Sequence, residues 1–147
     1  MHVTGFTFIR NAVKFDFPIV EAITSILPIC DEFMVAVGQS DDATLQLIQE
    51  ISPQKIRIIE TIWDESLQDG GVVYAKETDK AFRAISEKSD WAFYIQGDEV
   101  LHEHGYEAIR DAMVKYKDDK NVEGLLLNYR HFYVSIFFYS NKNTIFI

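Results

Sequence analysis

The sequence predicts a three-layer α/β/α fold, in which helices cover both faces of a mostly parallel β-sheet. Short apolar runs alternate with longer amphipathic segments along the chain, and helical connections between strands favour parallel pairing. The length of 147 residues corresponds to one ordinary domain. Hydrophobic residues make up 48% of the chain and charged residues 25%, which is typical of a globular protein with a buried core.

Strands are predicted where β-branched and aromatic residues form a short run that ends at turn residues. These runs are residues 3–9, 33–37, 55–62, 91–95 and 124–132. Helices are predicted where apolar residues recur every three or four positions. The first helix begins at Asp16, which can cap it, and ends at Pro28. The second follows residues 41–44, and the others cover residues 73–86 and 106–116. The apolar side of the helix over 73–86 is expected to carry Tyr74, Ala81, Phe82 and Ile85.

Charge and cysteine content exclude several classes of protein. The 23 acidic residues outnumber the 14 basic ones and give a net charge of −9, which argues against a nucleic-acid partner and against a polybasic membrane patch. The single cysteine, Cys30, excludes an internal disulfide and a cysteine-rich zinc site. The sequence has no signal-peptide pattern and no apolar run long enough to span a membrane, so we expect a cytoplasmic protein.

Three common ligand-binding motifs are absent from the sequence. The loop after the first predicted strand runs Arg10-Asn11-Ala12-Val13, so it is not the glycine-rich loop of a nicotinamide or flavin site. No phosphate-binding P-loop occurs, and no nucleophile elbow of the G-x-S-x-G type occurs.

Acidic residues follow three of the predicted strands. Because the carboxyl ends of parallel strands meet at one edge of a sheet, these side chains are expected to gather there. Clustered carboxylates repel one another unless a cation joins them, and hard oxygen ligands suit Mg²⁺ or Mn²⁺, which can bridge a diphosphate. The alternative is structural, since acids at such positions also cap helices and end strands. The residues concerned are Asp41, Asp42, Glu65, Asp69, Asp98 and Glu99.

Four stretches, taken in order, carry a resemblance to a known family. They are residues 8–11, at the end of the first strand; residues 21–42, with a helix, a strand and an Asp-bearing loop; residues 70–82, with a Gly-Gly turn and a helix; and residues 91–99, where a strand ends in Gln96-Gly97-Asp98-Glu99. Over roughly residues 1–133, this order resembles the family 2 glycosyltransferases of GT-A fold. The resemblance implies a Rossmann-like sheet that binds a nucleotide-sugar over its strand ends.

The resemblance also implies roles for particular residues. In the family, an Asp after the second strand contacts the nucleotide base, which points to Asp41 or Asp42. The D-x-D acids hold a metal ion on the diphosphate, which makes Asp98 the principal ligand of Mn²⁺ or Mg²⁺ and Glu99 the second one. The chain departs from the family pattern at Gln96, which stands where the first Asp of the motif is expected.

Two functions of different classes fit these residues. The first is a metal-dependent glycosyltransferase, of the hexosyltransferase type, with a UDP- or GDP-linked donor and a glycan or lipid-linked acceptor. Arg10 and Lys76 are cations that could offset the charge of the diphosphate. No residue is assigned as the catalytic base, which we expect outside this chain. The alternative is a non-catalytic nucleotide-binding or interaction domain that has lost the acceptor half.

The last residues differ from the rest of the chain. Residues 134–147 do not resemble the family, whose members continue with an acceptor segment, so we expect a truncated chain with a domain over 1–133 and an atypical tail. The segment that begins at Phe132 is strongly apolar and lacks charge as far as Ser140. We therefore expect it to fold back onto the sheet or to pair with a second chain in a homodimer.

Residues 102–104 carry two histidines and a glutamate. Together with Asp98 they could form a mixed metal site. A spacing of two residues suits one face of a helix poorly, so the sequence favours a surface loop instead.

Overall fold

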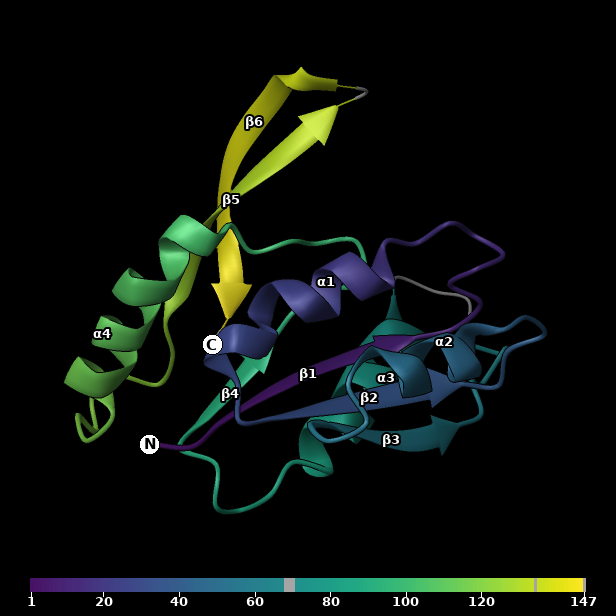
Figure 1. Cartoon of the computed structure of the whole chain (residues 1–147), viewed down its shortest axis with the longest axis horizontal. Coiled ribbons are helices and arrows are strands. Elements are labelled where there is room, and N and C mark those ends of the chain that lie inside the picture. The colour runs from purple at the N-terminus through teal and green to yellow at the C-terminus, as the bar shows by residue number, and fades with distance from the viewer. Residues whose placement is uncertain (68–70, 134, 147) are drawn as a thin grey trace.

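The structure is a computed structural model of the chain, and it describes residues 1–67, 71–133 and 135–146. Among these residues, no helix is both long enough and apolar enough to cross a membrane. Figure 1 shows the arrangement of the elements.

A parallel sheet of four strands forms the centre of the molecule. The strands are β1 (Val3–Ile9), β2 (Glu32–Gly38), β3 (Ile56–Thr61) and β4 (Trp91–Tyr94). Their order across the sheet is β3-β2-β1-β4, and each neighbouring pair is parallel. The direction of strand placement therefore reverses between β1 and β4, and such a switch point is where open α/β sheets bind ligands.

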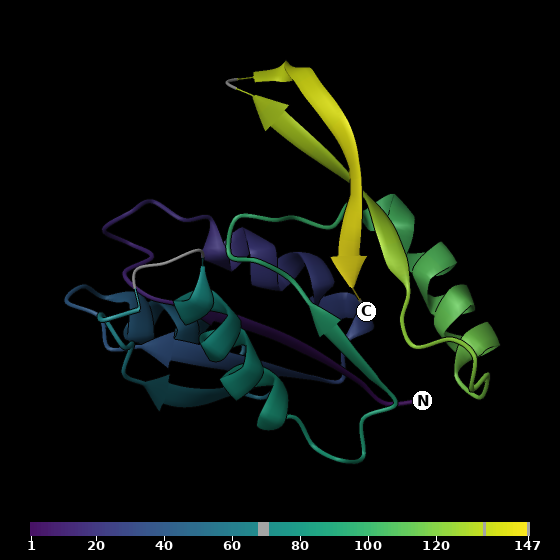
Figure 2. The same cartoon turned by 180° about the vertical axis from the view of Figure 1, so that it is seen from behind.

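Helices cover both faces of this sheet, which confirms the predicted α/β architecture. Helices α1 (Ile19–Ile26) and α2 (Thr44–Ile51) lie on one face, and α3 (Val72–Arg83) lies on the other (Figures 1 and 2). Helix α4 (Tyr106–Tyr116) flanks α1 beyond β4, where the Tyr106 hydroxyl donates to the Ser25 carbonyl at 2.6 Å. Two short 3-10 turns complete the helical segments, η1 (Leu27–Ile29) and η2 (Glu103–Gly105).

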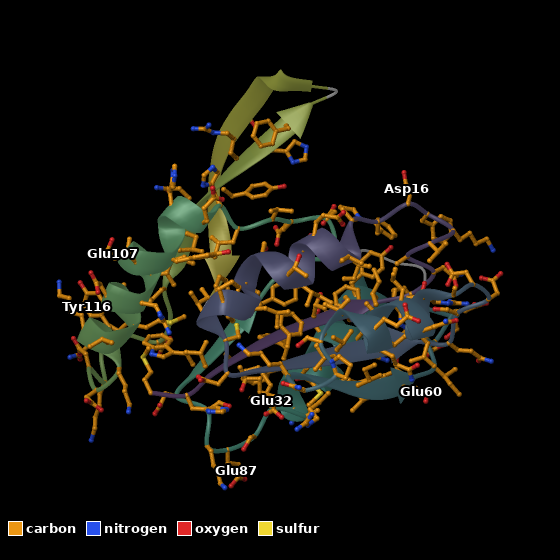
Figure 3. The ribbon with its side chains drawn as sticks, viewed as in Figure 1. Asp16, Glu32, Glu60, Glu87, Glu107 and Tyr116 are labelled. Carbon is orange, nitrogen blue, oxygen red and sulfur yellow. The ribbon has the colours of Figure 1, made fainter. Side chains whose placement is uncertain are left out.

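The core follows from the alternation of side chains along the strands. In β2, Phe33 and Val35 face the α1 side, where they pack with residues of α1, α2 and α4. Met34 and Ala36 face the other way and pack against Ala81 of α3. Side chains fill the space between α1 and the sheet, while charged residues such as Asp16, Glu87 and Glu107 lie on the outside (Figure 3).

The predicted start of the first helix is wrong. The helix begins at Ile19, after Pro18, and Asp16 does not cap it. Residues 11–17 form a turn of their own instead, in which the Phe17 N–H donates to the Ala12 carbonyl at 2.9 Å. Asp16 ends this turn with a φ of 53°, in the left-handed region, so a helix cannot pass through it.

The predicted apolar side of the third helix is also partly wrong. Tyr74 and Phe82 are more than half exposed, and the buried positions of α3 are Ala81 and Glu77. A charged residue therefore occupies the face that packs on the sheet, and hydrophobic periodicity does not detect it.

The fifth predicted strand does not join the parallel sheet. It forms β5 (Leu126–Tyr133), which pairs antiparallel with β6 (Ser135–Phe146) in a separate hairpin. From Leu126 to Phe132, exposed and half-buried residues alternate, which is the pattern of a strand covered on one face only. Most of the expected tail over 134–147 thus has a partner strand within the chain, and β6 also touches β4. Residues 134 and 147 of that tail lie outside the described residues.

Candidate functional site

A cavity of about 800 Å³ lies over the carboxyl ends of β1 and β4, at the switch point of the sheet. Its walls come from the loop after β1, the loop after β3, one side of α3 and the loop after β4. Within the described part of the chain, six aromatic side chains line it, together with one cation and one carboxylate. The lining residues are Phe8, Ile9, Arg10, Asn11, Phe15, Phe17, Trp63, Tyr74, Ala75, Thr78, Tyr94, Gln96, Gly97 and Asp98.

The loop after β1 is fastened to the loop after β2 through Asn11. The Asn11 backbone N–H donates to the Ser40 hydroxyl at 3.0 Å, and the Asn11 side-chain oxygen accepts from the Asp41 backbone N–H at 2.9 Å. Asn11 is buried and has a φ of 53°, a conformation that Asn tolerates better than most residues. These bonds hold the wall of the cavity that follows β1 in place.

Asp41 and Asp42 do not line this cavity. The Asp41 carboxylate forms an ion pair with the Lys14 ammonium at 2.7 Å, and this bond is the main reason why the pKa of Asp41 is lowered. Both oxygens of Asp42 accept backbone hydrogen bonds, from Thr44 and from Lys14, at 2.9 and 2.8 Å. Burial raises the pKa of Asp42, but the bonds from Thr44 and Lys14 outweigh it, so the pKa is lowered overall.

These contacts give both acids a structural role, because they tie the start of α2 to the loop after β1. Asp42 also borders a second hollow of about 510 Å³ at the ends of β2 and β3. The structure therefore places these two residues at the expected edge of the sheet, but beside the main cavity rather than inside it.

Arg10 contributes the cation of the main cavity. Its guanidinium donates to the Gln39 carbonyl at 3.0 Å and to the Glu65 carboxylate at 2.9 Å, and it lies 5.6 Å from the centre of the Trp63 ring. Glu65 is 75% exposed, so water competes for this ion pair. An anion that enters the cavity can exchange with Glu65 while the arginine stays stacked on the indole.

Asp98 contributes the carboxylate of the cavity. It is exposed, and no hydrogen bond or ion pair of its side chain occurs within the described part of the chain. Glu99 has a different environment, since one of its oxygens accepts the Gln96 backbone N–H at 2.9 Å and the residue does not line the cavity. Burial, which outweighs this bond, raises the pKa of Glu99. Among the described residues that follow β4, the side-chain oxygens that line the cavity are those of the Asp98 carboxylate and of the Gln96 amide, whose side chain also forms a hydrogen bond with the Tyr94 hydroxyl.

Helix α3 forms the aromatic wall with Tyr74, whose ring stacks on Phe8 at 5.8 Å and meets the Trp63 ring edge-on at the same distance. Lys76, two residues further along and therefore on a different side of α3, does not line the cavity, and its charge helps to lower the pKa of Asp64. The structure therefore brings Arg10 and Asp98 to one cavity and leaves Lys76 outside it.

A buried carboxylate that the sequence analysis missed holds α3 in place. Glu77 is 1% exposed, and it accepts from the Thr61 hydroxyl and from the Lys80 ammonium, both at 2.5 Å. Since Thr61 is the last residue of β3, these bonds fix the helix that carries Tyr74 and Thr78 against the sheet. The only signal in the sequence is a Glu three residues before a Lys on a helix, which is common on exposed faces.

The four-stranded parallel sheet and its helical layers define an α/β fold, and the structural neighbours of the chain have a GT-A-like fold. Among solved structures, the chain is similar to the Staphylococcus aureus glycosyltransferase TarS. It matches TarS 1-349 with a TM-score of 0.55 and 18% sequence identity, over 86% of this chain and 34% of that one. It matches a second TarS structure with the same TM-score and identity, over 80% of this chain and 20% of that one.

At this identity, the likeness establishes the fold. The chain spans about a third of the shorter TarS structure and a fifth of the longer one. The chain matches none of the protein-family models and none of the curated proteins with which it was compared.

Proposed function

We propose that this chain forms the donor-binding part of a metal-dependent glycosyltransferase, which transfers a sugar from a nucleoside diphosphate to an acceptor hydroxyl. The observation that carries the proposal is Asp98, an exposed carboxylate with no hydrogen bond or ion pair to its side chain among the described residues, in a ligand-sized cavity at the switch point of a GT-A-type sheet. A carboxylate in such a place is available to a cation that a diphosphate brings with it.

In this proposal, Asp98 and the side-chain oxygen of Gln96 are the residues that would hold Mn²⁺ or Mg²⁺. Such an ion would supply Lewis-acid stabilisation of the charge on the leaving diphosphate. Arg10 moves from Glu65 to a phosphate oxygen and supplies a second positive charge, with a fork geometry that suits phosphate. Glu99 supports the site indirectly, because its carboxylate accepts a hydrogen bond from the Gln96 backbone N–H at 2.9 Å and so fixes the start of this loop.

Asp41 is the better of the two candidates for a contact with the nucleotide base. Its side chain is 63% exposed and bound to Lys14, which it can release, whereas both oxygens of Asp42 serve the backbone. In this proposal the donor carries UDP or GDP, and the acceptor is a glycan or a lipid-linked sugar. The base that deprotonates the acceptor is assigned to none of the described residues.

A second candidate is a nucleotide-binding or interaction domain without transfer activity. Two observations favour it. Gln96 supplies a neutral ligand where the family pattern has a carboxylate, and Glu99 is turned toward the backbone. A domain of this kind would bind the nucleotide and fail to transfer the sugar.

The experiment is a titration with UDP and with GDP, followed by thermal unfolding and calorimetry, with and without Mn²⁺. We expect the nucleotide to stabilise the fold, and more so with the metal; at a hundredfold excess over Kd the gain is about 2.7 kcal/mol. The Asp98→Asn variant should lose the metal-dependent part of the gain and keep the stability of the free protein.

The matched control is Asp111→Asn on α4, which changes another exposed aspartate, one that does not line the cavity. It should behave like the parent chain. No shift with millimolar nucleotide and metal would refute the donor site, and unfolding of free Asp98→Asn would show that Asp98 is a structural residue. Binding without release of UDP or GDP from a nucleotide-sugar would favour the non-catalytic alternative.

A further inference from the structure

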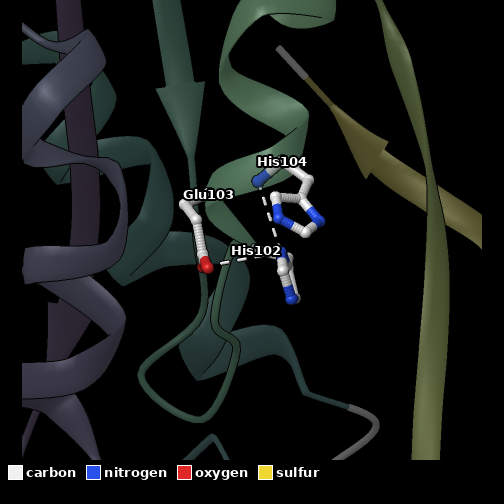
Figure 4. A group of neighbouring side chains, drawn as sticks. All are labelled: His102, Glu103 and His104. Atoms are coloured by element: carbon white, nitrogen blue, oxygen red, sulfur yellow. Dashed lines mark hydrogen bonds and ion pairs between the residues drawn. The ribbon is translucent and has the colours of Figure 1, made fainter.

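Two histidines and a glutamate come together in the turn that precedes α4. A spacing of two residues suits one face of a helix poorly, so the sequence predicts a surface loop over 102–104. In the structure, His102 has an extended backbone with a ψ of 134°, and the 3-10 turn η2 begins at Glu103. Because the backbone passes from an extended residue into a 3-10 turn at this point, the centres of the His102 and His104 rings lie 4.5 Å apart (Figure 4).

The ligand atoms of the three side chains lie at distances that suit one metal ion. One atom from each residue lies within 4.8 Å of the others, and all three side chains are exposed. The His102 Nδ1 lies 3.4 Å from a carboxylate oxygen of Glu103. Two ligands of a tetrahedral ion with bonds of about 2.1 Å lie roughly 3.4 Å apart, so this pair already has the required separation. A rotation of the exposed His104 ring brings the third ligand into place.

A backbone hydrogen bond orients the first ligand. The His104 N–H donates to the His102 Nδ1 at 3.2 Å, so that nitrogen carries a lone pair and the proton of the neutral ring sits on Nε2 (Figure 4). The lone pair is therefore directed at the His104 backbone N–H, and a Glu103 carboxylate oxygen lies 3.4 Å from the same nitrogen. When a metal ion takes it, the exposed His104 N–H is free to bind water.

We propose that His102, Glu103 and His104 form a binding site for a divalent transition-metal ion such as Zn²⁺, with water completing the coordination. Two imidazoles and one carboxylate select Zn²⁺, Ni²⁺ or Cu²⁺ over Mg²⁺ and Mn²⁺, which prefer oxygen ligands. The site is thus separate in chemistry from the one proposed at Asp98. It does not depend on the proposed transferase function.

The experiment is a titration of the full chain with ZnCl₂, observed through the imidazole NMR signals of its four histidines. We expect the signals of His102 and His104 to shift together with one dissociation constant, while those of His2 and His131 stay in place. A large excess of Mg²⁺ should not reverse the shifts. The variants His104→Ala and Glu103→Gln should each weaken binding, roughly tenfold or more for the histidine.

The matched control is His2→Gln, at the residue before β1, which should bind Zn²⁺ like the parent chain. The proposal is overturned if His102 and His104 do not shift with millimolar Zn²⁺, if they shift with different dissociation constants, or if His104→Ala binds as tightly as the parent. Because the readout uses no nucleotide, its failure is distinguishable from failure of the donor site.

Discussion

The buried carboxylate of Glu77 provides a direct test of how the cavity wall is held. Glu77→Ala removes the acceptor of the Thr61 hydroxyl and of the Lys80 ammonium. Thr61 is buried, so its hydroxyl loses its partner without gaining water, at about 1–3 kcal/mol. The space left by the missing side chain adds about 1 kcal/mol. Lys80 is 43% exposed and regains water, so it adds little.

Relief from burying a charge offsets part of this loss. The partner and cavity terms together amount to about 2–4 kcal/mol, and with this offset we expect Glu77→Ala to lower the free energy of unfolding by about 2–3 kcal/mol. For a chain of this size that corresponds to a fall in Tm of roughly 5–10 °C. Urea unfolding measures the free energy directly, and Glu77→Gln should lose less, since its side-chain oxygen still accepts from Thr61.

The control lies on the same helix. Asp79 forms an ion pair with Arg83 at 2.6 Å, but both side chains are more than half exposed, so Asp79→Ala should be close to the parent. If Glu77→Ala loses no more stability than Asp79→Ala, the buried carboxylate does not anchor α3, and the reasoning is refuted.

Two further predictions concern titration and reactivity. The pKa of Asp42 is lower in the folded chain, so its contribution to stability is present above the ordinary value of about 3.9 and is lost as the pH falls through the folded value. Asp42→Asn should therefore be less stable than the parent at pH 7, and the difference should shrink toward pH 3 in urea unfolding; a constant difference would contradict this. Burial raises the pKa of Cys30 to about 12, so iodoacetamide at pH 8 should label the unfolded chain much faster than the folded one, and equal rates would contradict it.

The parts of the fold that were predicted correctly have strong local signals. The strand over 3–9 matches β1, and the helix over 106–116 matches α4, because their hydrophobic periods are uninterrupted. Asp16 misled the prediction because Asp is a good cap on local grounds. The actual start depends on a turn over 11–17, whose bonds to residues 40–44 are tertiary and invisible in a local pattern.

The candidate site shows the same division. Asp98 follows a clear apolar strand, so its place at the sheet edge could be predicted, and so could that of Arg10 after β1. The residues with which these charged side chains pair could not be predicted from the sequence. Glu77 lies on a face that periodicity assigns to apolar residues, and it is buried only because Thr61 lies opposite it. The strand over 124–132 is placed in the parallel sheet by the alternation of strands and helices along the chain, whereas its antiparallel partner β6 lies in a segment for which that alternation predicts no strand.

Most of the acidic residues at this edge of the sheet have partners within the chain, which the sequence alone does not show. Asp41 is paired with Lys14, Glu65 with Arg10, and Glu99 with a backbone N–H. The ion pairs thus neutralise Asp41 and Glu65 within the chain, whereas the pKa of Glu99 is raised mainly by burial and in part by the charge of Asp98, so the repulsion that remains at this edge is between Asp98 and Glu99.

Asp98 lines the cavity, and its carboxylate has no hydrogen bond or ion pair among the described residues. One carboxylate and one amide oxygen bind Mn²⁺ or Mg²⁺ only weakly, because these ions prefer more oxygen ligands. A diphosphate supplies the missing oxygens. It follows that, in the proposed site, the metal and the nucleotide should bind cooperatively, each weakly alone. Tight binding of Mn²⁺ at Asp98 in the absence of nucleotide would contradict this prediction, because these residues provide too few ligands for it.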